Sequence, residues 1–159
     1  MFIPVEKSED KLENYKRLID TMPYYLNETD PWYTTLSNAA AILDYFLDDV
    51  NWVGFYLNEP DALYLGPFQG LAACTKIMMG SGVCGTAAKN EETLVVEDVN
   101  QFEGHITCDS NSQSEIVIPF KKEGVLFGVL DIDSPKKMRF DEADKENLEK
   151  VMAIVVDKL

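Results

Sequence analysis

The chain has 159 residues, the size of one ordinary domain, and 46% of them are hydrophobic, which excludes a disordered chain. Its 14 basic and 28 acidic residues give a net charge of −14. Nucleic acids and anionic membranes attract positive surfaces, so neither is an expected partner. The negative charge favours solubility first, and a cationic group on a substrate would also fit it.

No apolar run approaches the ~18 residues of a membrane helix, and the first residues lack a secretory pattern, so a cytoplasmic protein is expected.

The first third of the chain has helical patterns. Apolar residues recur at helical spacing after Ser8, which predicts a helix over residues 9–22 with Ser8 as its N-cap. These apolar residues are Leu12, Tyr15, Ile19 and Met22. A second helix is expected to begin with Asp30 as its cap and Pro31 in its first position. Its apolar stripe consists of Leu36, Ala40, Leu43 and Leu47.

From Asn51 onward, aromatic and β-branched residues indicate short strands. The expected strands cover residues 51–57, 62–65, 72–77, 93–97, 115–120 and 125–133. Short turns join the first two and the last two of these strands into hairpins. A glycine-rich turn over residues 80–88 leads into a short helix, and residues 98–114 form a long polar loop of the kind that often carries function. A last helix should begin at Asp141, with Asp144 completing a capping-box-like arrangement.

This order of elements predicts an α+β fold with a largely antiparallel central sheet flanked by N-terminal and C-terminal helices. We expect one domain over residues 1–159. Its helical N-terminal region covers about 9–48, the sheet with its loops about 51–135, and the C-terminal helix about 141–159.

Three cysteines carry the first candidate chemistry, since an odd number of thiols in a reducing compartment argues against a structural disulfide framework. Cys84 lies in the glycine-rich turn before a helix, where N–H groups and the helix dipole favour a thiolate or an anionic ligand. Cys108 lies in the long loop near His105, where a thiol can be reached. Alternatively, Cys84 is a packing residue and Cys108 an incidental surface thiol. These residues and Cys74 lack a C-x-x-C pair, so no metal site is predicted.

Acidic residues on the last two strands form a second candidate group. Asp131 and Asp133 alternate with apolar residues, which places both carboxylates on one face of a strand. Glu115 begins the preceding strand and could approach them across the hairpin. Carboxylates inside an apolar strand are costly without a partner, and a bound ammonium group would be one. For Asp133, the alternative is that it begins the turn at residues 134–135.

Two further features concern a small ligand. Trp52, Gly54 and Tyr56 share one strand face, and the glycine between two aromatic residues leaves a hollow that a ligand could fill, although core packing is the commoner explanation. The backbone amides of the turn from Gly80 to Gly85 could hold a carboxylate.

Together these segments resemble the free methionine-(R)-sulfoxide reductases, a family built on a single GAF domain. The matching segments are NWVGFY, LGPFQG, ACTKIMMGSGVCGTAA, GHITCDSNSQSEIVIP and GVLDIDSP. The match extends over about residues 51–135, and the three cysteines have the family's spacing. Met78 and Met79, before the glycine turn, are bulkier than the family pattern and would alter the cavity wall.

The resemblance implies roles for the candidate residues. Cys108 attacks the sulfoxide sulfur, Cys84 resolves the resulting sulfenic acid as a disulfide, and Cys74 pairs with Cys84 as an auxiliary thiol. The substrate pocket consists of Trp52 and Tyr56 around the methyl sulfoxide, and of Glu115, Asp131 and Asp133 around the amino group and the sulfoxide oxygen. One carboxyl, with Asp131 as a candidate, stays protonated as the acid, since clustered carboxylates cannot all ionise cheaply.

The expected activity is therefore the thiol-dependent reduction of free L-methionine (R)-S-oxide to L-methionine. The protein would be an oxidoreductase that acts in the response to oxidative stress. No bound cofactor is implied, only an external dithiol reductant of the thioredoxin type. Two alternatives are a GAF sensor that binds a small ligand and a redox-sensing thiol protein without a substrate. Turnover with a thioredoxin system would separate them. A homodimer would fit, because GAF domains often pair through helices.

Overall fold

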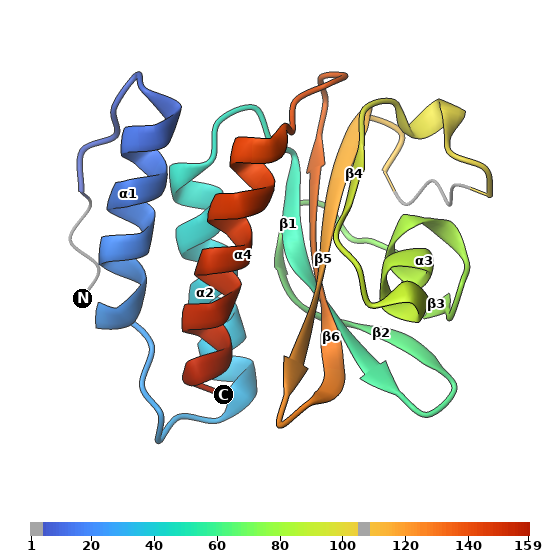
Figure 1. Ribbon diagram of the computed structural model, residues 1–159, viewed down its shortest axis with the longest axis horizontal. Coiled ribbons are helices and arrows are strands. Elements are labelled where there is room, and N and C mark those ends of the chain that lie inside the picture. The colour runs from blue at the N-terminus through green and yellow to red at the C-terminus, as the bar shows by residue number, and fades with distance from the viewer. Residues whose placement is uncertain (1–4, 105–108) are drawn as a thin grey trace.

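The computed structural model describes residues 5–104 and 109–159, which form a central sheet with helices on both faces (Figure 1). The strands are β1 (Trp52–Glu59), β2 (Ala62–Gln69), β3 (Lys76–Met78), β4 (Leu94–Val96), β5 (Ser114–Lys122) and β6 (Val125–Ser134). The helices are α1 (Lys11–Thr21), α2 (Trp32–Phe46), α3 (Gly82–Asn90) and α4 (Glu142–Asp157), with short 3-10 turns η1 (Met22–Tyr24) and η2 (Val99–Gln101).

The sheet has six strands in the order β3-β2-β1-β6-β5-β4, and every neighbouring pair is antiparallel. Helices α1, α2 and α4 lie on one side of it, whereas α3 lies on the other (Figure 1). The predicted α+β class with an antiparallel sheet and flanking helices is confirmed. Within the described part of the chain, no helix is long and apolar enough to cross a membrane.

The helix starts differ from the sequence predictions in two of three cases. Asp10, not Ser8, caps α1, because its side chain accepts a hydrogen bond from the amide of Glu13 at 2.8 Å. Pro31, not Asp30, is the N-cap of α2, and it caps without a side-chain hydrogen bond. The predicted capping box of α4 is present, with the Asp141 and Asp144 side chains each accepting from the other's amide.

The strand predictions were correct for both hairpins but not for the third strand. The pair β1–β2 and the pair β5–β6 form as expected. The third strand covers Lys76–Met78 rather than residues 72–77, so residues 72–75 lie outside it. The short turn η2 lies inside the predicted loop of residues 98–114.

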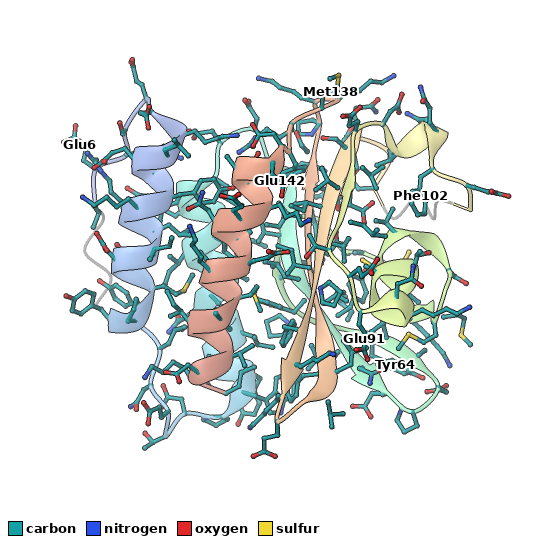
Figure 2. The ribbon with its side chains drawn as sticks, viewed as in Figure 1. Glu6, Tyr64, Glu91, Phe102, Met138 and Glu142 are labelled. Atoms are coloured by element: carbon teal, nitrogen blue, oxygen red, sulfur yellow. The ribbon has the colours of Figure 1, made fainter. Side chains whose placement is uncertain are left out.

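Strand alternation divides the interior into two cores. Val53 and Phe55 of β1 lie on the face that packs against α1, α2 and α4. Trp52 and Tyr56 lie on the opposite face, in the core that includes α3. Figure 2 shows side chains on both faces of the sheet, with Phe102 on the α3 side. Fully burying one such side chain contributes roughly 1.5–3 kcal/mol to the stability of the fold. Each core therefore holds the helices on its side against the sheet.

A glycine contact holds α3 close to the sheet edge. A Cβ atom on Gly85 would lie 2.3 Å from the backbone oxygen of Met78, so only glycine permits this approach. The amide of Gly80 donates to the Gly85 carbonyl at 2.8 Å and closes the turn. The start of α3 is thereby fixed beside β3.

Candidate active site

Three acidic side chains meet on the α3 face of the sheet. In the β5–β6 pairing Glu115 lies opposite Asp133, and Asp131 lies two residues earlier on the same face of β6. Only 6% of Glu115 and 6% of Asp131 is exposed, whereas Asp133 is half-buried. The structure therefore brings together the three carboxyls that the sequence singled out.

Burial dominates the electrostatics of this acid cluster. Burial raises the pKa of Asp131 to about 6, and hydrogen bonds with Cys84 and Glu115 limit the rise. Burial, followed by the charges of Asp131 and Asp133, raises the pKa of Glu115 well above its usual range. The pKa of Asp133 is also raised, by burial and then by the charge of Asp131. Since the charge of Asp131 opposes ionisation of Glu115, the electrostatics favour Glu115 over Asp131 as the group that keeps a proton.

Cys84 on α3 points at these acids. Its thiol is 4% exposed and donates to Glu115 Oε1 at an Sγ–O distance of 3.8 Å. Burial, followed by the charges of Asp131 and Glu115, raises the pKa of this thiol well above its usual range. The sequence-based expectation that the helix start favours a thiolate here is wrong, because desolvation and two neighbouring carboxylates outweigh the helix dipole.

The start of α3 offers amides to the same space. The side chain of Ser81, the N-cap, makes no capping hydrogen bond. The first-turn N–H groups of residues 82–84 have no partner within an α-helix by geometry. In contrast, the amides of Gly80 and Gly85 donate to backbone carbonyls. The part of the turn suited to a carboxylate is therefore residues 82–84, not the whole turn from Gly80 to Gly85.

The aromatic pair of β1 lines the site but leaves no hollow over Gly54. The Trp52 indole stacks on Tyr56 and on Phe68, with centroids 5.9 Å and 5.3 Å apart. A Cβ atom on Gly54 would lie 2.4 Å from Phe68 Cβ and 2.5 Å from Trp52 Cη2, so these side chains fill the expected hollow. Trp52 Nε1 donates to the Leu71 carbonyl at 3.0 Å, which fixes the indole ring.

The site is a narrow cleft with two lobes that share Asp109, Asp131 and Asp133. One lobe, of about 30 Å³, is lined in addition by Ile77, Ser81, Gly82, Val83, Cys84, Ser112 and Glu115. The other, of about 10 Å³, is lined in addition by Trp52, Tyr56, Leu71, Ala72 and Ala73. The two lobes thus place thiol, acids and aromatic rings around one small space.

The remaining cysteines differ in what the structure shows. Cys108 and His105 lie outside the described residues, but Asp109, the residue after Cys108 in the sequence, lines both lobes. Cys74 is half-buried, and its carbonyl accepts from the Tyr56 hydroxyl at 3.0 Å. Cys84 is a free thiol, so a disulfide between it and Cys74 is not formed here.

Sequence reasoning missed a polar group that supports the loop end. Asn51 Nδ2 donates to Asp109 Oδ2 at 2.9 Å and to Ser112 Oγ at 3.2 Å. Ser112 is buried and also hydrogen-bonds with Asp133, which limits the rise in the pKa of that carboxyl. The available signal was an asparagine directly before an aromatic strand, together with a polar loop too long for a simple turn.

Comparison with known proteins identifies the class of domain. The family model for the GAF domain matches residues 33–156, so fold and site together are those of a GAF domain with a thiol and carboxyls in its pocket.

Individual relatives define the family more closely. The free methionine-R-sulfoxide reductase of Escherichia coli (strain K12) is 50% identical over 119 residues, 75% of this chain and 72% of the relative. That of Saccharomyces cerevisiae is 46% identical over 132 residues, 78% of this chain and 73% of the relative. The X-ray structure of free methionine-R-sulfoxide reductase from Neisseria meningitidis in complex with its substrate is 38% identical, with a TM-score of 0.92 over 99% of this chain and 95% of that chain. The chain belongs to the free methionine-R-sulfoxide reductase family of GAF-domain proteins.

Proposed function

We propose that the protein reduces free L-methionine (R)-S-oxide to L-methionine with electrons from its own thiols. One observation carries the proposal: a small, narrow cleft is lined by a free thiol, three carboxyls with raised pKa values and two aromatic rings. A sulfoxide needs an acid at its oxygen and a thiol at its sulfur, and this cleft offers both kinds of group. The names of the relatives support the same reaction.

The proposed substrate pose uses each part of the cleft. The ammonium group lies against Asp131 and Asp133, where it offsets buried negative charge. The carboxylate accepts hydrogen bonds from the amides of residues 82–84 at the start of α3, where the helix dipole also favours an anion. The methyl sulfoxide end lies toward Trp52 and Tyr56. A peptide-bound methionine has neither charged end, so the free amino acid is the expected substrate.

The proposed chemistry begins at Cys108. Its thiolate attacks the sulfoxide sulfur while a carboxyl protonates the oxygen. Free methionine leaves, and the oxygen passes to Cys108 as a sulfenic acid, so that the sulfoxide is reduced and the thiol oxidised by two electrons. We assign the acid to Glu115, since burial and then the charge of Asp131 raise its pKa and favour the protonated form.

A second thiol then condenses with the sulfenic acid, which forms a disulfide and releases water. The family resemblance assigns this step to Cys84. The raised pKa of Cys84 works against it, because the thiolate is the reacting form. Cys74 is the more exposed of the two and is the alternative resolving thiol. The proposal therefore includes either thiol, and single substitutions distinguish them.

An external dithiol of the thioredoxin type would complete the cycle by thiol–disulfide exchange, with no bound cofactor. Such donors act in reducing compartments, which fits a cytoplasmic protein. A homodimer through the helical layer remains part of the proposal.

The proposal is tested by thioredoxin-coupled consumption of NADPH with free methionine sulfoxide as substrate. We expect turnover by the unaltered protein, none by Cys108→Ser and a large loss of kcat in Glu115→Gln. Asp61→Asn serves as the matched control, because this exposed carboxylate pairs with Lys76 away from the cleft and should leave activity unchanged. Full activity in Cys108→Ser would refute the proposed reaction.

A further inference from the structure

The acid cluster and Cys84 have a geometry that the proposed reduction does not require. Sγ of Cys84, a carboxylate oxygen of Glu115 and a carboxylate oxygen of Asp131 all lie within 4.8 Å of one another, and all three residues are buried. If all three groups were ionised, anions at such separations would repel one another, and a cation between them would offset that repulsion.

Asp131 supplies an independent observation that points to a ligand at this position. Its Oδ1 atom is buried and has no hydrogen-bond partner in the described part of the chain. With only 6% of the residue exposed, water from the surface offers little compensation. A buried carboxylate oxygen without a partner is costly, so the site is built for an occupant that supplies positive charge.

The donor set and the distances select among cations. Zinc bonds of about 2.3 Å to sulfur and about 2.0–2.2 Å to oxygen in a tetrahedron place the two ligand atoms roughly 3.6 Å apart. The observed separation between Cys84 Sγ and Glu115 Oε1 is 3.8 Å. Magnesium and calcium prefer oxygen ligands alone, whereas a set with one thiolate suits a softer divalent ion.

We propose that Cys84, Glu115 and Asp131 form a binding site for a thiophilic divalent cation of the zinc class. When this cation is bound, it prevents the ammonium group of the substrate from binding at Asp131. The ion takes three protein ligands and leaves a fourth position open. Its charge offsets that of the carboxylates, as the ammonium does. It also coordinates the Cys84 thiolate, which then cannot resolve the sulfenic acid. Bound metal therefore inhibits turnover. These ligands differ from the set of three cysteines and His105, which the sequence spacing disfavours.

The experiment is a calorimetric titration of the reduced protein with Zn²⁺, repeated with Co²⁺ to detect the absorption of a cobalt–thiolate bond. We expect one ion per chain. Cys84→Ser and Glu115→Gln should each weaken binding by roughly tenfold or more, since loss of even a supporting residue commonly costs that much. Cys74→Ser is the matched control and should keep the affinity, because in the reduced protein it removes a cysteine that does not belong to the set of Cys84, Glu115 and Asp131. Circular dichroism verifies that each variant is folded.

Equal zinc affinity in the unaltered protein and both cluster variants would overturn the proposal. So would loss of binding in Cys74→Ser, which would place the ion on other cysteines. The competition between zinc and the substrate ammonium depends on the proposed function and is tested separately. Free methionine is added to a zinc titration in which a metal buffer fixes the free Zn²⁺ concentration, because the amino acid itself chelates zinc. Lower apparent zinc affinity supports the shared site. If methionine leaves the zinc affinity unchanged, zinc does not exclude the ammonium group, and the proposed substrate pose is also contradicted. The assignment of Cys84 and Glu115 as metal ligands is tested independently, by the zinc affinities of the two variants.

Discussion

Asp131→Asn tests how much stability the acid cluster costs. The Asp131 pKa is raised from 3.8 to about 6, chiefly by burial. A carboxyl with a raised pKa in the folded state stabilises the fold while it is protonated, and this contribution is lost as the pH rises through the folded pKa. At 1.36 kcal/mol per pKa unit, the cost of ionised Asp131 is about 3 kcal/mol at pH 8 and roughly half of that at pH 5.

An asparagine carries no charge at either pH, so Asp131→Asn should be more stable than the unaltered protein at pH 8. Its advantage in the free energy of unfolding should widen, by an amount on the order of 1 kcal/mol, between pH 5 and pH 8. Substrate reduction should fall at the same time, because the ammonium loses a charged partner. Urea unfolding at the two pH values, followed by circular dichroism, measures the stability difference.

Asp61→Asn is the matched control. Hydrogen bonding to Lys76 lowers the pKa of this exposed carboxyl, so its substitution should give no gain at pH 8. The reasoning is refuted if the advantage of Asp131→Asn does not widen with pH, or if the variant is less stable than the unaltered protein at pH 8.

Three further predictions follow from the cleft and its support. Cys84→Ser should release one methionine per chain and then stall with Cys108 as a sulfenic acid, as mass spectrometry can detect; continued turnover would assign the resolving step to Cys74. The N-acetyl form of methionine sulfoxide should lose at least about a hundredfold in kcat/KM, because its nitrogen carries no charge; values comparable to those of the free amino acid would contradict the pose. Gly85→Ala should lower the free energy of unfolding by about 1–3 kcal/mol, since its Cβ would overlap the Met78 carbonyl; an unchanged thermal midpoint would contradict this.

Strand periodicity was enough to predict the acid cluster. Asp131 and Asp133 are two residues apart, so alternation alone places them on one face. The short hairpin turn after β5 then sets Glu115 opposite Asp133. Local chemistry of this kind depends only on neighbours in the sequence, which is why both hairpins and the capping box of α4 were also predicted.

The cap of α1 and the filling of the hollow were not predictable, because each depends on which of several possible contacts the fold selects. Ser8 and Asp10 both carry a capping oxygen, and Ser8 instead bonds with Asn14 and with the Asp10 amide. The hollow at Gly54 is filled because Trp52 folds over it onto Phe68 of the neighbouring strand.

The ionisation of Cys84 was beyond sequence reasoning for the same cause. A helix start by itself favours the thiolate. Burial of the thiol raises its pKa most, followed by the charges of Asp131 and Glu115, and only the packing of α3 against the later strands produces both effects.

The most direct measurement is chiral analysis of racemic free methionine sulfoxide incubated with the reduced protein and a thioredoxin system. We predict that the R epimer disappears, that methionine appears in equal amount and that the S epimer remains. Loss of both epimers at equal rates, or no methionine formed with either, would contradict a free methionine-(R)-sulfoxide reductase.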